Sequence, residues 1–282
     1  MTPNSIQPVR IAAVGDLHIR THIPEELQED LIALNDRVDL IVVAGDITDG
    51  GRIPEVELAA EMFSPIRVPI VAVLGNHDRR GLRRTVMRRV LGASGLQLLD
   101  GDAVLLQLAD GRRVGVAGIS GTGGGFYLDE ADAVIGGRLR QAVAIKARRE
   151  AARLEQALET LEAGCPDVTI ALTHFAPTIT TLGEEPPLKY WMLGNSLLGR
   201  IIDGHPVDLV VHGHAHIGNE VGATPGETPV RNVALPVTGG IVILEVGPGQ
   251  QVRSVGGRRA PSTSHDLPRI PGANMMDVLR II

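Results

Sequence analysis

Seven side chains of the kinds that bind metal ions stand in short polar motifs along the chain. They comprise two carboxylates, one amide and four imidazoles: Asp16, His18, Asp46, Asn76, His174, His214 and His216. Seven ligands exceed what one ion needs, but they suit two ions that share a bridging carboxylate. Nitrogen and oxygen donors without sulfur favour Mn, Fe or Zn. We therefore expect two divalent ions, ~3.5–4 Å apart, that clamp a phosphoryl group and generate hydroxide between them.

Each of these motifs follows a short, largely aliphatic run, which identifies the elements that must position the ligands. The runs are residues 10–14, 40–44, 70–74, 168–173 and 209–211. Runs without polar alternation are typical of strands buried on both faces, as in a parallel sheet covered by helices. Ligands of such sheets lie beyond the carboxyl ends of the strands. The pattern therefore predicts that all five motifs meet at one edge of one sheet.

The spacing of the first three motifs predicts a repeated strand–helix unit. Asp16, Asp46 and Asn76 follow one another at intervals of 30 residues, which is the length of a strand, a helix and the return. The helices are expected at residues 24–37 and 54–63, where apolar residues recur at helical spacing.

Later segments complete the predicted architecture. Residues 103–108 and 113–119 flank a short Asp-Gly turn and predict a β-hairpin. Residues 138–162 have the apolar stripe of a long amphipathic helix. Two further strands within residues 230–246 are expected to close a second sheet.

Composition excludes several classes of protein. A hydrophobic content of 44% and a mean hydropathy of +0.12 exclude wholesale disorder. A net charge of −6 argues against a general nucleic-acid coat protein. Cys165 is the only cysteine, so neither an intramolecular disulfide nor a thiolate cage is expected. The polar start and the short apolar run after it predict a cytoplasmic protein without a membrane partner.

The motifs together resemble the calcineurin-like metallophosphoesterase superfamily. Its pattern runs D-x-H, G-D, G-N-H-D/E, a later H and G-H-x-H, and all five blocks occur in order between residues 10 and 246. The resemblance implies a four-layer α/β/β/α sandwich of two mixed sheets flanked by helices, with a dinuclear metal site at the strand C-terminal edge. We expect this domain to cover residues 1–256 and a tail to cover 257–282, where residues 275–282 are expected to form a short docking helix.

The same resemblance implies a role for each residue. One ion takes Asp16, His18 and His216, and the other takes Asn76, His174 and His214, with Asp46 between them. His77 matches the family's catalytic histidine, which contacts the phosphate and protonates the leaving group. Asp78 is expected to orient His77 through its second ring nitrogen.

Two departures from the superfamily's pattern argue against two of its branches. Gly50 stands where phosphoprotein phosphatases have an arginine, and Asp49 stands where purple acid phosphatases have a tyrosine ligand. The G-N-H-D block is more similar to the phosphodiesterase branch. We therefore expect hydrolysis of a small phosphoester, a diester rather than a monoester, by a metal-bridging hydroxide. The alternatives are a nuclease acting on DNA or RNA and a non-catalytic scaffold, as the retromer subunit with this fold is.

Two features concern the substrate. Arginines are dense after the catalytic block, and Arg80, Arg84 and Arg88 would share one face of a helix. That face is either an ordinary solvated surface or a positive flank that steers an anionic substrate. Five of the six aromatic residues lie in segments that follow the predicted ligand-bearing strands: Phe126, Tyr127, Phe175, Tyr190 and Trp191. They form either a small local core or a stacking platform for a nucleotide-like substrate.

Overall fold

The computed structural model describes residues 7–81, 84–126, 137–248 and 252–256. The expected tail and its docking helix at residues 275–282 lie outside the described residues, as does Tyr127. Among the described helices, none is long and apolar enough to cross a membrane.

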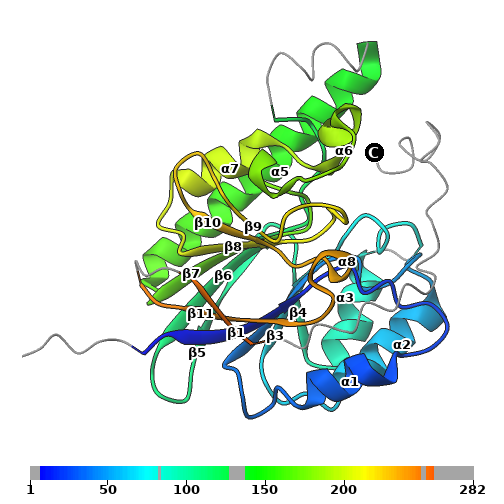
Figure 1. Ribbon diagram of the computed structural model, residues 1–282, viewed down its shortest axis with the longest axis vertical. Helices are drawn as coiled ribbons and strands as arrows, with labels where there is room; N and C mark the ends of the chain where they lie inside the picture. Colours follow the sequence, from blue (N-terminus) through cyan, green and yellow to red (C-terminus); the bar gives the residue numbers. More distant parts are fainter. Residues whose placement is uncertain (1–6, 82–83, 127–136, 249–251, 257–282) are drawn as a thin grey trace, which may run out of the picture.

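The first of two six-stranded sheets is mixed (Figure 1). Its order is β12-β11-β1-β2-β3-β4, and the bounds are β1 (Val9–Val14), β2 (Leu40–Ala44), β3 (Ile70–Val73), β4 (Leu96–Leu99), β11 (Val242–Val246) and β12 (Arg253–Gly256). Strands β1 to β4 are parallel to one another, whereas β11 pairs antiparallel with both β1 and β12. The apolar runs at residues 10–14, 40–44 and 70–74 therefore form strands β1, β2 and β3 of this sheet, as predicted.

The second sheet is also mixed and carries the last two ligand motifs. Its order is β5-β6-β7-β8-β10-β9, and the bounds are β5 (Asp102–Gln107), β6 (Arg113–Ile119), β7 (Val168–Thr173), β8 (Leu209–His212), β9 (Val221–Ala223) and β10 (Pro229–Asn232). The antiparallel pairing of β5 with β6 confirms the predicted hairpin. The central strands β6, β7, β8 and β10 are parallel.

Two sequence predictions about the sheets are wrong. The five motifs do not share one sheet: β1, β2 and β3 carry three of them, and β7 and β8 of the second sheet carry the other two. The two strands predicted within residues 230–246 separate as well, because the chain crosses back through α8 (Leu235–Thr238) after β10. Strand β11 therefore joins the first sheet beside β1.

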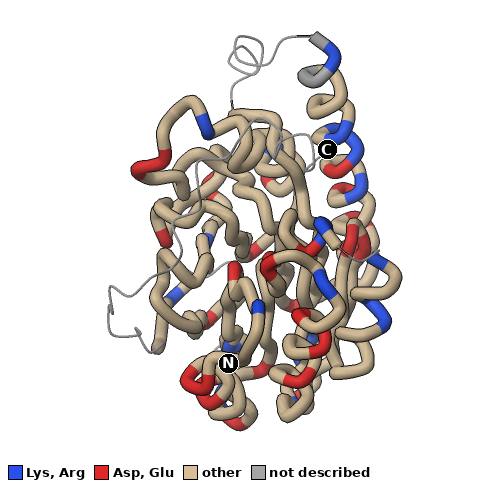
Figure 2. Tube along the Cα trace, turned by 90° about the vertical axis from the view of Figure 1, so that its right-hand side faces the viewer, with Lys and Arg blue, Asp and Glu red and all other residues tan. Residues whose placement is uncertain are grey.

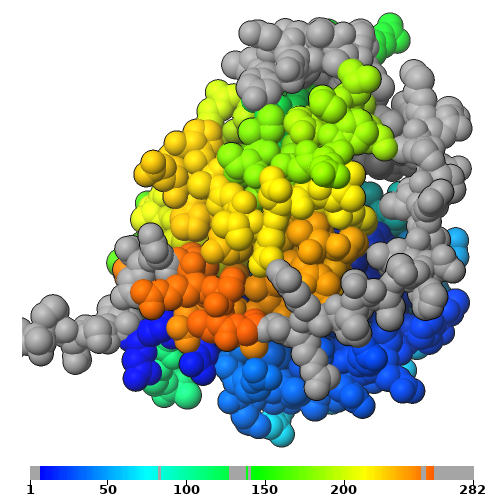
Figure 3. Space-filling model, viewed as in Figure 1, coloured from blue at the N-terminus to red at the C-terminus, as the bar shows by residue number. Residues whose placement is uncertain are grey.

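Helices cover the outer face of each sheet (Figure 1). The first sheet is covered by α1 (Glu25–Ile32), α2 (Ile53–Phe63) and α3 (Arg84–Ala93), and the second by α5 (Gly137–Gly164) and α7 (Ser196–Asp203). Short helical turns η1 (Ile179–Thr181), η2 (Pro187–Lys189) and α6 (Tyr190–Leu193) precede α7. The space-filling view shows the blue N-terminal part below the green and yellow part that contains these turns (Figure 3).

Alternation along the strands builds the four layers. In β1, Ala12 and Val14 pack toward the helices, whereas Ile11 and Ala13 pack between the sheets. Because both faces of the strand are apolar, both are buried, which explains the absence of polar alternation in the sequence. The predicted four-layer α/β/β/α sandwich is the observed fold.

Candidate metal centre

The backbone is unusual at the predicted ligands. Asp16, His18, Asp46 and His214 have positive φ values of 57°, 46°, 47° and 69°. Only two other described non-glycine residues, Cys165 and Glu227, share this conformation. Left-handed backbone is unfavourable for residues with a Cβ atom, and it persists mainly at functional sites where the surrounding structure enforces it. The strain therefore concentrates where the sequence places the ligands.

Glycines beside the ligands make room for their polar atoms. A Cβ atom on Gly75 would lie 2.0 Å from Oδ1 of Asp46, and one on Gly213 would lie 2.2 Å from Oδ2 of Asp16. Any larger residue at these positions would displace a carboxylate that is almost fully buried. The glycines of the G-N-H-D and G-H-x-H blocks are thus required by the site and not only by a turn.

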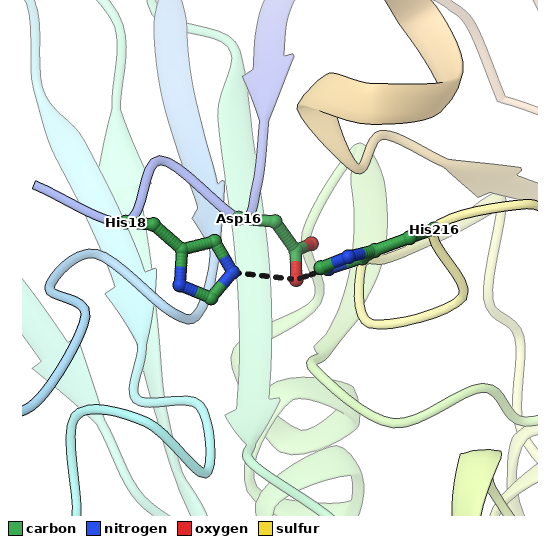
Figure 4. A group of neighbouring side chains, drawn as sticks. All are labelled: Asp16, His18 and His216. Atoms are coloured by element: carbon green, nitrogen blue, oxygen red, sulfur yellow. Dashed lines mark hydrogen bonds and ion pairs between the residues drawn. The ribbon is translucent and has the colours of Figure 1, made fainter. Parts of the chain in front are cut away.

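The first group of ligands joins the two sheets. Asp16 and His18 follow β1, while His216 follows β8, and all three side chains converge (Figure 4). Nε2 of His216 lies 2.8 Å and Nε2 of His18 lies 4.0 Å from Oδ1 of Asp16. Burial opposes ionisation of Asp16, but the hydrogen bond with His216 and the nearby imidazoles hold its pKa below the usual range. Asp16 is therefore ionised and lies between two histidine rings.

The second group comprises Asn76, His174 and His214 beside Asp46. Nδ1 of His174 lies 2.8 Å from the carbonyl oxygen of Ala44 and donates to it, so Nε2 carries the lone pair. That nitrogen lies 3.0 Å from the amide oxygen of Asn76 and 3.5 Å from Oδ2 of Asp46. Three acceptors that face one another are the arrangement that a cation between them would stabilise.

Asp46 lies between the two groups. Its Oδ2 is 3.8 Å from Nε2 of His18 and 3.5 Å from Nε2 of His174, while its Oδ1 accepts the backbone N–H of His77 at 2.8 Å. Burial, followed by the negative charge of Asp16, raises the pKa of Asp46 well above its usual range. Cations on both sides of this carboxylate would remove that penalty and favour its ionised form.

Buried nitrogens without partners support the same assignment. Both ring nitrogens of His18 are buried and have no hydrogen-bond partner among the described residues. Burial lowers the pKa of His18 to about 4, and that of His174 likewise to about 4, so both rings are neutral near pH 7. A neutral imidazole with an unsatisfied buried nitrogen is costly unless it binds an ion. The residues present therefore fit two divalent ions.

His77 is oriented by a residue other than the predicted one. Its Nδ1 lies 2.8 Å from the carbonyl oxygen of Asp49 and 3.5 Å from a carboxylate oxygen of the same residue. Asp78 instead points inward, where its carboxylate accepts the backbone N–H groups of Ile47, Thr48 and Gly75. The predicted pairing of Asp78 with His77 is wrong, because these backbone donors already occupy the carboxylate.

Asp49 is the site residue whose role the sequence analysis missed. One carboxylate oxygen lies 3.4 Å from Nδ1 of His18, while Arg20 holds the carboxylate at 3.0 and 3.1 Å. One acidic residue thus touches both a predicted metal ligand and the predicted catalytic histidine. Its position three residues after Asp46, within the same block, was the available signal.

The arginine-rich segment does not form the predicted stripe. Helix α3 begins only at Arg84 among the described residues, so Arg80 lies outside it. Arg84 pairs with Asp100 and Arg88 pairs with Asp102. Basic and acidic positions accordingly lie interspersed on the face shown in Figure 2. A phosphate track of the kind expected of a nuclease is therefore largely neutralised here.

The described aromatic residues in this region pack in different ways. The buried ring of Phe175 packs against His214, with ring centroids 4.3 Å apart. Phe126 and Tyr190 are partly buried against a small core that contains Ala176. Trp191 is half-buried and does not belong to that core.

Comparisons with known proteins agree with this geometry. Residues 9–218 match the family described as calcineurin-like phosphoesterase. Over 53 residues the chain is 36% identical to the glycerophosphodiester phosphodiesterase GpdQ of Enterobacter lignolyticus, and this match covers 19% of each protein. Over 124 residues it is 25% identical to the metallophosphoesterase YkuE of Bacillus subtilis, covering 42% of this chain and 43% of that protein. The matched part of the chain thus spans less than half the length of these curated relatives.

A solved structure shares the fold. The phosphopantetheinyl hydrolase PptH of Mycobacterium tuberculosis superposes with a TM-score of 0.58 at 16% identity, over 81% of this chain and 89% of that chain. The family match covers most of the chain and includes the strands and loops that carry every predicted ligand. The chain belongs to the calcineurin-like phosphoesterase family, a family of metal-dependent phosphoester hydrolases.

Proposed function

We propose that the protein is a phosphodiesterase that hydrolyses small organic phosphodiesters at a centre of two divalent ions. One observation carries the proposal: Oδ2 of Asp46 lies 3.8 Å from His18 in one ligand group and 3.5 Å from His174 in the other. A carboxylate in this position suits a bridge between two ions. We infer that Asp16, His18 and His216 hold the first ion and Asn76, His174 and His214 the second.

The donor set supports Mn, Fe or Zn, because imidazoles and carboxylates are present and sulfur is not. When bound, such a pair of ions neutralises the phosphoryl oxygens and supplies an acidified water as the nucleophile. Hydrogen bonds from His174 to Ala44 and from His214 to Met192 fix which ring nitrogen each imidazole presents to an ion. Each of these two rings therefore has its other nitrogen left for an ion.

His77 is proposed as the residue that exchanges a proton with the leaving group. Nδ1 donates to the carbonyl oxygen of Asp49, which leaves Nε2 as the nitrogen available to the substrate. The His18 ring stacks edge-on against that of His77, with centroids 4.5 Å apart, so the ring lies beside the first ligand group. Asp49 and His18 orient the ring, while the carboxylate of Asp78 is hydrogen-bonded elsewhere.

Preference for a diester is supported by the segment beside the second ligand group that contains Gly124, Trp191 and Met192, which we call the wall of the site. Nε2 of His214 lies 3.3 Å from the carbonyl oxygen of Met192, and the N–H of Gly124 donates to the carbonyl oxygen of Trp191 at 2.7 Å. The loop after β6 is therefore tied to α6 over its described part. A half-buried Trp191 on this wall offers apolar surface to an organic group that a monoester lacks. The local identity to a glycerophosphodiester phosphodiesterase points the same way.

The test compares matched substrates that share a leaving group. Metal-free protein is reloaded separately with Mn, Fe and Zn, and kcat/KM is measured on bis(p-nitrophenyl) phosphate and on p-nitrophenyl phosphate. We expect the diester to be preferred with at least one metal and no turnover without metal. A higher kcat/KM on the monoester with every metal would refute the diesterase assignment while leaving phosphoester hydrolysis intact.

A further inference from the structure

Most of the arginines that follow the catalytic block are already paired. Arg79 lies 3.3 Å from Asp100, and Arg84 contacts the same carboxylate. Arg153 of α5 also reaches Asp100, at 3.2 Å. Three guanidinium groups from a loop and two helices thus share one carboxylate, and this network braces the two helical layers. These three arginines are therefore engaged in ion pairs within the protein.

Arg80 differs from these neighbours. Its side chain is exposed, and within the part of the chain that the structure describes it has neither an ion pair nor a side-chain hydrogen bond. Its backbone N–H donates to the carbonyl oxygen of His77 at 3.1 Å. The unpaired cation therefore starts from the same turn as the catalytic histidine.

That turn is held firmly on both sides. Asp78 is fully buried and accepts the backbone N–H groups of Ile47 and Thr48 in the loop after β2 and of Gly75 in its own loop. On the other side Gly81 packs against Gly51, where a Cβ atom would lie only 2.3 Å from the carbonyl oxygen. With its backbone fixed between these contacts, Arg80 extends a flexible side chain from a rigid point. Such a residue can close on a ligand without movement of the main chain.

The turn brings Arg80 close to the reacting groups. The backbone N–H of Arg80 donates to the carbonyl oxygen of His77 at 3.1 Å, and the backbone N–H of His77 donates to Oδ1 of Asp46 at 2.8 Å. Arg80 is therefore linked through one short turn to both the proposed catalytic histidine and the carboxylate between the ligand groups. An anion bound beside His77 would gain from a cation that no carboxylate of the described residues neutralises.

We propose that Arg80 binds a non-bridging oxygen of the substrate's phosphoryl group, as a third positive charge beside the two metal ions. This inference rests on the proposed function and adds the residue that holds the phosphoryl group on the His77 side. The planar guanidinium suits two phosphoryl oxygens at once, which an ammonium group does not. Arg80 would contact the group in both the bound substrate and the phosphate product.

The first experiment measures binding without turnover. Inorganic phosphate is titrated calorimetrically into the metal-loaded protein, its Arg80→Gln variant and a matched Arg89→Gln control. Arg89 is also exposed and without an ion pair among the described residues, but it lies on α3 away from the catalytic turn. We expect Arg80→Gln to raise the Kd about 10- to 100-fold, the usual effect of losing a charge-assisted hydrogen bond. Arg89→Gln should change the Kd less than about 2-fold.

Kinetics provide the second readout. Arg80→Gln should lower kcat/KM on bis(p-nitrophenyl) phosphate by a similar factor with unchanged metal content, and Arg80→Lys should recover part of the loss. An unchanged phosphate Kd in Arg80→Gln, or an equal change in Arg89→Gln, would overturn the proposal. If the unaltered protein hydrolyses no diester, the proposed function fails, and the phosphate titration still decides the role of Arg80.

Discussion

The two sheets contribute different chemistry to one centre. The loops after β1, β2 and β3 supply every oxygen donor, namely Asp16, Asp46 and Asn76, together with His18. The loops after β7 and β8 supply only imidazoles: His174, His214 and His216. Three of the four left-handed ligand residues also belong to the first sheet. We therefore propose that the strained, carboxylate-bearing half positions the ions and that the imidazoles of the other half complete their coordination.

The largest effect is expected from the residue between the two groups. Asp46→Ala withdraws the carboxylate that both ions would share and leaves their mutual repulsion less screened. We expect the variant to lose at least one metal equivalent and nearly all activity, about 1,000-fold or more, while it stays folded. Elemental analysis and circular dichroism check this. Two full equivalents in the folded variant would show that Asp46 is not a shared ligand.

A smaller loss is expected on the imidazole side. His174 and His216 belong to different ligand groups, so His174→Ala and His216→Ala should each deplete one ion and retain about one equivalent. Asp46→Ala should lose more than either. Metal content measured in the three variants sharpens the comparison of the sheets. If either histidine variant lost both ions, the two groups would not be independent.

His77 should matter for chemistry and not for metal binding. A poor alkoxide leaving group needs a proton in the transition state, whereas nitrophenolate largely does not. His77→Asn should keep both ions and lose about 100- to 10,000-fold on alkyl diesters, with a smaller loss on nitrophenyl diesters. Rates on both ester types, with metal content as the control, test this. Equal losses would mean that His77 only positions the phosphate.

The contrast between Asp49 and Asp78 separates orientation from folding. Asp49→Asn should lower activity about 10- to 100-fold with little change in stability, because this carboxylate touches His18 and His77. Asp78→Asn should instead lower the free energy of unfolding by about 1–3 kcal/mol, since an amide nitrogen cannot accept the N–H groups that Asp78 accepts. Denaturant-induced unfolding and kcat/KM, both measured on the two variants, test these expectations. A reversed pattern would restore the pairing of Asp78 with His77.

The smallest effect concerns the wall beside the second group. Stacking of an aromatic group on Trp191 is worth about 1–3 kcal/mol, so Trp191→Ala should raise KM on aryl or nucleoside diesters about tenfold. Metal content and the KM of a small alkyl diester should stay the same. An unchanged KM on the aryl substrate would return Trp191 to a packing role.

The sequence alone determined the candidate ligands and the strands beneath them. Each motif directly follows an apolar run, and both features are local: β2 and β7 have the predicted bounds, and every predicted ligand lies in a segment that follows a strand. The local sequence pattern also predicted the hairpin of β5 and β6 and the long helix α5. A buried strand needs a continuous apolar run, and a polar residue just beyond it must lie at the sheet edge.

Only the tertiary structure decided which strands pair and which loop side chains meet. Strands of both sheets have the same apolar pattern, so nothing local separates β3 from β7 or assigns β11 to the first sheet. In the same way, Asp49 rather than Asp78 faces His77 because the direction of a side chain in a loop depends on which backbone donors lie nearby. Asp100, in the turn between β4 and β5, pairs with Arg84, whereas Arg80 has no ion pair among the residues that the structure describes. Such contacts join residues that the spacing of motifs cannot relate.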